Sequence, residues 1–261
     1  MKIVKYLHEN EINHGVIKNN EIKKIKGNIF SSFDIENKSI NLKKVELLSP
    51  IIPPNIIAIG LNYKKHAEEG SSQLPMKPLI FLKATTSLAG PNDFIKLPKK
   101  APTEVDFEAE LAVIIGTKAK NVEKENALKY VLGYSCANDV SARDCQKRID
   151  KQWARGKSFD TFCPLGPVIE TDTNPQDLNI KSILNGKTMQ NSNTSDMIFT
   201  VKEIVSYLSK NMTLLPGTVI LTGTPEGVGF ARDNPIFLQA GDQIEIKIED
   251  IGSLKNKVIK A

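Results

Sequence analysis

The stretch Val105-Asp106-Phe107-Glu108-Ala109-Glu110-Leu111-Ala112-Val113-Ile114-Ile115-Gly116 joins an acidic first half to an apolar second half. The β-branched run that ends at Gly116 predicts a buried strand. Because side chains alternate between the two faces of a strand, Asp106, Glu108 and Glu110 would project from one side. Like charges on one face repel one another and resist burial, so the face is solvated, paired with lysines or occupied by a cation. The stretch alone leaves these alternatives open.

The composition is that of a globular protein. With 261 residues, 40% of them hydrophobic, the chain can bury a large core as one domain or as a small domain plus a larger one. It has no apolar run long enough to span a bilayer and no signal-peptide core after Met1, so we expect a cytoplasmic protein without a membrane partner. Cys136, Cys145 and Cys163 lack Cys-x-x-Cys spacing and predict neither disulfides nor a zinc site.

The charged residues restrict the ligands that we expect. The net charge of +5 comes mostly from lysines scattered along the chain, whereas nucleic-acid binders concentrate basic residues on one face, so we expect no nucleic-acid partner. Three of the four arginines fall between Arg143 and Arg155, and the planar guanidinium group suits carboxylate or phosphate recognition. With only three histidines in the chain, a metal here should be a hard, oxygen-ligated ion such as Mg²⁺, Mn²⁺ or Ca²⁺.

The chain divides near a cluster of prolines. Residues 1–50, rich in Lys, Asn and Ile with short strand-like pieces, predict a small N-terminal β-rich module. The prolines of residues 49–54 predict a stiff junction. Strand patterns separated by a few helices then predict that residues 51–261 form a β-rich α+β domain.

A short helix is predicted after the strand of residues 55–60. Asn62 would be its N-cap and Gly70 would end it. His66 and Glu69 stand three residues apart, so they would share a helix face and could hydrogen-bond. Such a pair can orient an imidazole to take a proton from water, although a surface histidine beside a surface glutamate is the commoner arrangement for a lone pair of this kind.

Two capping-box patterns and one glycine-rich segment follow. Asp139 comes near the end of a predicted strand, and Ser141 with Asp144 predicts a helix that runs towards Trp153. The segment 200–203 is a second capping box, which predicts a helix over residues 204–209. The glycine-rich segment 222–229 would offer hydroxyl and backbone N–H groups to an anionic ligand, or would simply form a turn.

Several motifs occur together, in the order in which they stand in one known family. They are Gly60-Leu61-Asn62-Tyr63-x-x-His66-x-x-Glu69, Phe81-Leu82-Lys83, Asp106-Phe107-Glu108-Ala109-Glu110-Leu111-Ala112, Asn138-Asp139-Val140-Ser141-Ala142-Arg143-Asp144-x-Gln146, residues 155–167 and Thr222-Gly223-Thr224-Pro225-x-Gly227-Val228-Gly229. Over about residues 55–258 the chain resembles the fumarylacetoacetate hydrolase superfamily, in its short bacterial and archaeal form.

The resemblance implies a fold and a metal site. The fold would be a mixed β-roll catalytic domain of this type with a small N-terminal β-rich module, and the protein would be a homodimer. The metal, Mg²⁺ or Mn²⁺, would be bound by Glu108, Glu110 and Asp139. Asp106 would then be a neighbour of the site and not a ligand.

The resemblance also implies the other site residues. His66 and Glu69 match the pair thought to activate water in the hydrolytic members, and Lys157 matches a catalytic lysine beside the metal. The positions that match residues around the substrate are Lys83, Arg143, Gln146 and Thr224. We expect the substrate to be a small 2-oxo acid.

The implied reaction is metal-dependent cleavage of a C–C bond, by hydrolysis or decarboxylation, in 2-oxo or 2,4-dioxo acids such as acylpyruvates or oxaloacetate. The metal and Lys157 would stabilise the enolate that this cleavage leaves. Isomerisation of 2-hydroxyhepta-2,4-diene-1,7-dioate, decarboxylation of its carboxylated precursor 5-carboxymethyl-2-oxo-hex-3-ene-1,7-dioate, and ureidoglycolate lyase activity are alternatives. A module that binds a structural metal without catalysis is the non-enzymatic alternative.

Overall fold

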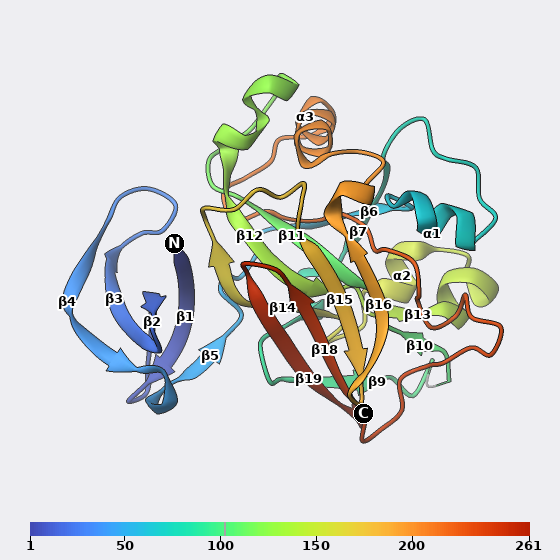
Figure 1. Cartoon of the computed structure of the whole chain (residues 1–261), viewed down its shortest axis with the longest axis horizontal. Coiled ribbons are helices and arrows are strands. Elements are labelled where there is room, and N and C mark those ends of the chain that lie inside the picture. Colours follow the sequence, from blue (N-terminus) through green and yellow to red (C-terminus); the bar gives the residue numbers. More distant parts are fainter. Residues whose placement is uncertain (102) are drawn as a thin grey trace.

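Most of the chain is built around one large sheet (Figure 1). The structure is a computed structural model that describes residues 1–101 and 103–261. The strands of the large sheet run in the order β4 (Phe33–Asn41), β3 (Glu21–Gly27), β2 (Glu11–Lys18), β1 (Lys2–His8), β14 (Cys163–Glu170), β12 (Val131–Asn138), β11 (Ala109–Ile115), β17 (Val219–Leu221), β6 (Ile56–Gly60) and β7 (Leu79–Lys83). Two short strands join it, β5 (Glu46–Leu48) beside β1 and β8 (Leu88–Ala89) beside β14.

The N-terminal strands form a lobe beside the main body, in blue in Figure 1. Strand β1 connects the two parts because it pairs antiparallel with β14, opposite Glu170 and Ile169. The fold is therefore β-rich, with an N-terminal β module attached through the large sheet, in agreement with the predicted fold class.

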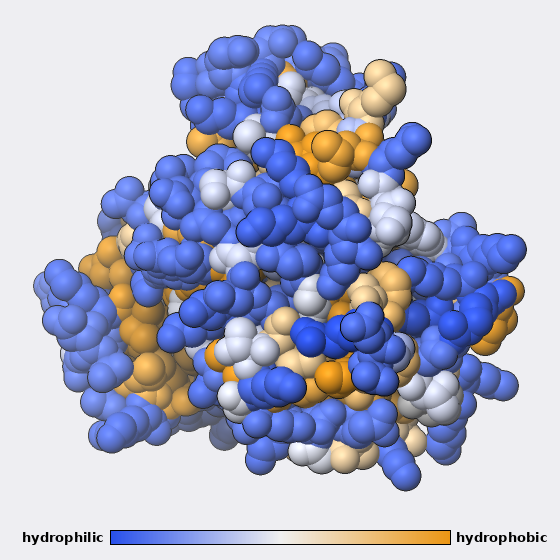
Figure 2. Space-filling view, turned by 45° about the vertical axis from the view of Figure 1, so that its right-hand side comes forward, coloured by the Kyte–Doolittle hydropathy of each residue, from blue (hydrophilic) through white to orange (hydrophobic). Residues whose placement is uncertain are grey.

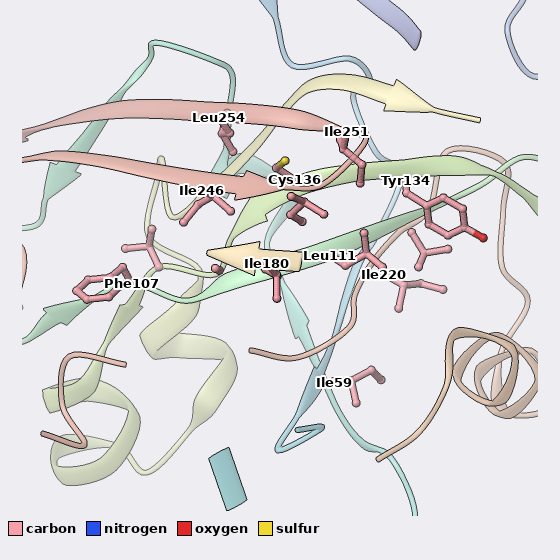
Figure 3. Close-up of a cluster of buried hydrophobic side chains, with 14 of the residues drawn as sticks. Ile59, Phe107, Leu111, Tyr134, Cys136, Ile180, Ile220, Ile246, Ile251 and Leu254 are labelled. Carbon is pink, nitrogen blue, oxygen red and sulfur yellow. The ribbon is translucent and has the colours of Figure 1, made fainter. Parts of the chain in front are cut away.

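A second sheet covers one face of the large sheet. Its strands run in the order β16 (Lys187–Asn193), β15 (Asn179–Leu184), β18 (Gln243–Ile248), β19 (Gly252–Lys260) and β9 (Phe94–Leu97). Figure 3 shows apolar side chains of β11 and β12, among them Leu111 and Cys136, facing Ile246 and Leu254 of the second sheet. These side chains are fully or almost fully buried, so the main core lies between the two sheets.

Strand β11 is buried along its whole length. Leu111 and Val113 belong to the core between the sheets, whereas Ala112 and Ile114 belong to a second apolar cluster on the opposite face. Burial on both faces explains why this strand has a continuous apolar run instead of an alternating pattern.

The acidic half of the opening stretch does not continue this strand, contrary to the prediction. Strand β10 (Val105–Asp106) pairs with β13 (Ser141–Ala142) in a separate two-stranded sheet. Phe107 and Glu108 lie between β10 and β11, so the chain changes sheets there and the strict alternation of faces is lost.

The helices are short and lie outside the sheets (Figure 1). They are α1 (Lys64–Glu69), α2 (Trp153–Lys157), α3 (Val201–Asn211), 3₁₀ helices at Leu42–Lys44, Thr85–Ser87, Lys124–Tyr130 and Thr194–Asp196, and a π-helix at Asp144–Ile149. None of the helices in the described ranges is long and apolar enough to cross a membrane. The face visible in Figure 2 is mostly hydrophilic, with hydrophobic side chains gathered in smaller areas.

Local capping signals were only partly correct. Both hydrogen bonds of the capping box between Thr200 and Glu203 are present at the start of α3. Asn62, in contrast, is not the N-cap of α1, because its buried side chain hydrogen-bonds to Phe199 and Thr222. The Ser141 capping box is also wrong, since Ser141 lies in β13 and its hydroxyl donates to the carbonyl oxygen of Asp139.

Candidate active site

Three carboxylates meet where β11 and β12 come together. The antiparallel register places Ala109 opposite Asn138, so Glu108 lies beside Asp139, whose N–H donates to the Glu108 carbonyl oxygen at 2.9 Å. One carboxylate oxygen from each of Glu108, Glu110 and Asp139 lies within 4.8 Å of the others. All three side chains are buried, at most 7% exposed, which rules out a solvated acidic face.

Two lysines contact this cluster. The Nζ of Lys157, the last residue of α2, donates to Glu108 Oε2 at 2.8 Å and to Asp139 Oδ2 at 2.5 Å. Lys83, from the end of β7, contacts the other oxygen of Asp139 and donates to the carbonyl oxygen of Phe162 at 3.0 Å. Both ammonium groups are almost fully buried, and their contacts with Asp139 offset part of the cost of burying its charge.

The carboxylates differ in how well they are compensated. Burial disfavours the charge of Glu108, but Lys157 and Arg143 hold its pKa well below the ordinary value. Burial, together with repulsion from Asp139 and Glu108, raises the pKa of Glu110 well above the ordinary value. The only protein hydrogen bond found to the Glu110 carboxylate, within the described residues, comes from the N–H of Gly223 at 2.7 Å.

This donor set suits a divalent cation. Three carboxylates supply only oxygen ligands, which Mg²⁺, Mn²⁺ and Ca²⁺ prefer. An ion among them would also remove the repulsion that disfavours the charged form of Glu110. The residues therefore fit the predicted type of metal, and Glu108, Glu110 and Asp139 are the ones that could hold it.

Arg143 connects the cluster to Asp106. Its Nη2 lies 2.7 Å from Glu108 Oε1 and 2.8 Å from Asp106 Oδ2, and its Nε donates to Asp106 Oδ2 at 2.9 Å. Asp106 is fully buried and also accepts hydrogen bonds from the backbone N–H groups of Gly229 and Phe230. As expected, Asp106 is a neighbour of the carboxylate cluster and not one of its three members. It orients Arg143 and the glycine-rich segment.

His66 and Glu69 are paired as the sequence predicts. His66 Nδ1 lies 3.1 Å from Glu69 Oε2, and both side chains are partly buried. Glu69 Oε1 accepts from the N–H of Gly227 at 2.9 Å. Burial opposes the charge of Glu69, but the hydrogen bonds from His66 and Gly227 lower its pKa. The interpretation of His66 and Glu69 as a simple surface pair is therefore wrong, because Glu69 is hydrogen-bonded to the glycine-rich segment.

The glycine-rich segment binds the carboxylates of the protein itself. The N–H groups of Gly223, Gly227 and Gly229 donate to Glu110, Glu69 and Asp106. The predicted anionic ligand is thus replaced, at these three groups, by side chains of the chain. Gly223 has a φ of +99°, and a Cβ there would come within 2.7 Å of Asn62 Cβ, so only glycine fits at this close approach.

The predicted site residues surround a cavity of about 280 Å³. Those that line it are His66, Glu108, Glu110, Asp139, Arg143, Gln146, Lys157 and Thr224. Lys83 and Glu69 lie one layer behind, where they hold Asp139 and His66. The Thr224 hydroxyl donates to the carbonyl oxygen of Ala109 and accepts from Gln190, so it stabilises the wall.

Three further residues of the cavity wall were not predicted from the sequence. Trp153 packs edge-on against Phe81 on the apolar side. Lys147 places its Nζ 3.5 Å from the centroid of the Phe230 ring. Burial, and next the charge of Arg143, lowers the pKa of Lys147. Lys147 directly follows Gln146, the last residue of a matched motif, and this position could have indicated that it lies at the site. The sequence around Phe230 contains no comparable indication.

Relatives were found by sequence comparison. A family model described as fumarylacetoacetate (FAA) hydrolase C-terminal matches residues 55–259, and one described as Rv2993c-like, N-terminal matches residues 1–50. The mitochondrial oxaloacetate tautomerase fahd2 of Xenopus laevis is 45% identical over 234 residues, which cover 88% of this chain and 73% of that protein. An uncharacterised protein of Methanocaldococcus jannaschii is 47% identical over 84% of this chain and 86% of its own.

Solved structures resemble the chain over its whole length. A 5-carboxymethyl-2-hydroxymuconate delta-isomerase from Mycobacterium smegmatis has a TM-score of 0.91 and 40% identity, with 100% of both chains covered. A 2-hydroxyhepta-2,4-diene-1,7-dioate isomerase from Mycobacterium marinum has a TM-score of 0.90 and 40% identity, covering 100% of this chain and 98% of its own. The motifs, the fold and these matches agree, and the chain belongs to the fumarylacetoacetate hydrolase family.

Proposed function

We propose that this protein catalyses metal-dependent keto–enol isomerisation of small 2-oxo dicarboxylic acids, with oxaloacetate as the first candidate substrate. The observation that carries the proposal is the buried cluster of three carboxylates, contacted by Lys157, at the wall of a cavity. Relatives named for tautomerisation or isomerisation support this reaction over the C–C cleavage expected from the sequence.

The cavity residues can bind a 2-oxo acid and stabilise its enolate. A divalent ion on the three carboxylates would supply a Lewis acid for the negative charge of an enolate. The Lys157 ammonium would add a second positive charge at the same place. Arg143 Nη1 donates to Gln146 Oε1 at 2.9 Å, so Arg143 orients Gln146, and the Gln146 amide N–H groups would donate to a substrate carboxylate.

The His66–Glu69 pair would move the proton. Because Glu69 holds Nδ1, Nε2 is the ring nitrogen left to react with a substrate in the cavity. In the direction from ketone to enol, Nε2 would take a proton from C3, and the imidazolium so formed would give this proton to the ketone oxygen, which leaves the imidazole neutral again. The reverse direction returns the proton to C3, so no water is consumed.

Cleavage of a C–C bond is the second candidate function. The same pair could activate a water molecule for hydrolysis of an acylpyruvate, because His66 lines the cavity. Decarboxylation of oxaloacetate requires only the enolate-stabilising groups. Dienedioate isomerisation, decarboxylation of its carboxylated precursor and ureidoglycolate lyase activity are further assays for the same site.

The test follows the ultraviolet absorbance of enol-oxaloacetate in weakly buffered solution with Mg²⁺. We expect the protein to accelerate loss of the enol at least a hundredfold over the same solution without protein, and EDTA to abolish the effect. A coupled lactate dehydrogenase assay measures pyruvate from decarboxylation, and acetylpyruvate serves as the hydrolysis substrate. If pyruvate were released while the loss of the enol was not accelerated, C–C bond cleavage would be the better supported function. If Glu108→Ala lowered only the thermal stability and no 2-oxo acid reacted, the metal would be structural.

The assembly implied by the resemblance stays a prediction. We propose a homodimer, and light scattering after size-exclusion chromatography would give twice the chain mass of 28.9 kDa. A monomer at the concentration used for the kinetic assays would contradict it.

A further inference from the structure

The π-helix Asp144–Ile149 places the positively charged side chain of Lys147 at the cavity wall. Arg143, Gln146 and Lys147 are spaced by three and four positions, so they share one side of this turn, and all three line the cavity. Helical turns of this wide type are rare and occur often at functional sites.

The other cations at the site are already paired. Lys83 and Lys157 contact Asp139, and Arg143 lies against Asp106 and Glu108. Within residues 1–101 and 103–261, Lys147 forms no ion pair with a carboxylate. It is therefore the cavity cation whose charge is still available to a ligand.

The position of Lys147 is defined by an aromatic ring. Its Nζ lies 3.5 Å from the centroid of Phe230, and the Cζ of Arg143 lies 4.3 Å from the same centroid. Phe230 is held in turn because its backbone N–H donates to the buried Asp106 at 3.1 Å. A lysine held over a ring loses less freedom on binding an anion than a lysine that extends into solvent.

The charge balance indicates which anion. In the carboxylate cluster and its direct contacts, four carboxylates (Asp106, Glu108, Glu110 and Asp139), counted as ionised, face three paired cations (Lys83, Arg143 and Lys157), which leaves one net negative charge. Glu69, behind His66, is counted separately because the charge of Arg232 favours its ionised form. A divalent ion would change this to one positive charge, which the single carboxylate of a 2-oxo monoacid neutralises. Lys147 adds the second positive charge that a dianion requires.

We propose that Lys147 binds the distal carboxylate of the substrate and makes the site selective for 2-oxo dicarboxylates over 2-oxo monocarboxylates. This inference rests on the proposed function for the substrate head group, which the carboxylate cluster and Lys157 would hold. Lys147 is then a substrate-binding residue that sets specificity, at the end of the ligand away from the enolate.

The experiment compares the binding of 2-oxoglutarate and 2-oxopentanoate, which differ in the distal carboxylate, by calorimetry with Mg²⁺. The wild type should bind 2-oxoglutarate at least tenfold more tightly. Lys147→Met should remove about tenfold of this preference through weaker binding of 2-oxoglutarate alone, and Lys147→Arg should keep most of it. Lys64→Met, the same charge change at an exposed lysine of α1 that does not line the cavity, should keep all of it.

Two results overturn the inference. One is a wild type without preference for the dicarboxylate, and the other is Lys147→Met weakening both ligands equally or neither. The kinetic assay separates this failure from failure of the proposed function. If the wild type converts enol-oxaloacetate and Lys147→Met has an unchanged kcat/KM, the function stands and the inference falls. If oxaloacetate does not react but the binding preference depends on Lys147, the inference stands and the function falls.

Discussion

Substitution of Glu110 by glutamine should stabilise the metal-free protein. Glu110 is the carboxylate of the cluster that burial and its two acidic neighbours leave unfavourably charged. The amide oxygen of Gln can still accept the hydrogen bond from Gly223, so Glu110→Gln removes the charge and keeps this contact. Stabilisation by loss of a buried side-chain charge would be a specific consequence of the carboxylate cluster.

The magnitude follows from proton linkage. A raised folded-state pKa means that stability is full below the unfolded pKa of about 4.5 and declines as the pH rises towards the folded pKa. Because the ionised form is the disfavoured one at pH 7.5, we expect Glu110→Gln to raise the free energy of unfolding, by an amount within the ordinary range of single substitutions, on the order of 1 kcal/mol. For a chain of this size that is a rise in Tm of about 2 °C. The difference from the wild type should shrink towards pH 5.

Glu108→Gln is the matched control with the opposite sign. Glu108 contacts both Lys157 and Arg143, which hold its pKa well below the ordinary value. Loss of its charge leaves two buried cations undercompensated, and breaking a buried pair typically costs about 3–5 kcal/mol. The two variants remove the same charge from neighbouring positions, so a difference in sign can come only from the partners of each carboxylate.

The assay is urea unfolding followed by the fluorescence of Trp153, the single tryptophan, in EDTA and in Mg²⁺. Mg²⁺ at about a hundred times its dissociation constant should stabilise the wild type by about 2.7 kcal/mol. It should stabilise Glu110→Gln less, because one ligand is lost. If Glu110→Gln were as destabilising in EDTA as Glu108→Gln, Glu110 would not be the uncompensated carboxylate, and the reasoning that leads to a cation there would be refuted.

Three further changes test other parts of the structure. Asp106→Asn should lower the free energy of unfolding by about 3 kcal/mol, because Arg143 loses the charge of one of its two buried partners; a change below about 0.5 kcal/mol would contradict this. His66→Gln should reduce the kcat of enol loss at least a hundredfold while Mg²⁺ still stabilises the protein, and an unchanged kcat would exclude His66 from proton transfer. Burial raises the pKa of Cys136 from about 9 to about 12, so ionisation of the unfolded thiol should cost the wild type about 1.4 kcal/mol of stability per pH unit above pH 9. Cys136→Ala should have a shallower decline in urea unfolding between pH 9 and 11, and parallel curves would argue against a buried neutral thiol.

Features encoded by neighbouring residues were predictable from the sequence. The apolar run of residues 109–115 forms a strand because its side chains are buried on both faces. The capping box of Thr200 and Glu203 forms because both of its hydrogen bonds join residues three positions apart. The identity of the three clustered carboxylates came from the motifs, and the structure brings them together.

Other local signals failed because a partner distant in the chain competed successfully. Asn62 makes hydrogen bonds to residues 137 and 160 positions away instead of capping α1. The N–H groups of the glycine-rich segment donate to Glu110, Glu69 and Asp106, which lie far away in the sequence. A pattern in the sequence indicates which groups can hydrogen-bond, but not which distant group becomes their partner in the folded protein.

The sequence alone determined the family, the β-rich fold class and the types of side chain at the site. Only the tertiary structure decided which carboxylates are compensated by cations, that Asp106 holds Arg143 and Phe230, and that Lys147 faces the cavity unpaired within the described residues. The physical reason is that charge compensation depends on distances of a few ångströms between segments that are remote in the chain. Those distances are set by sheet register and packing.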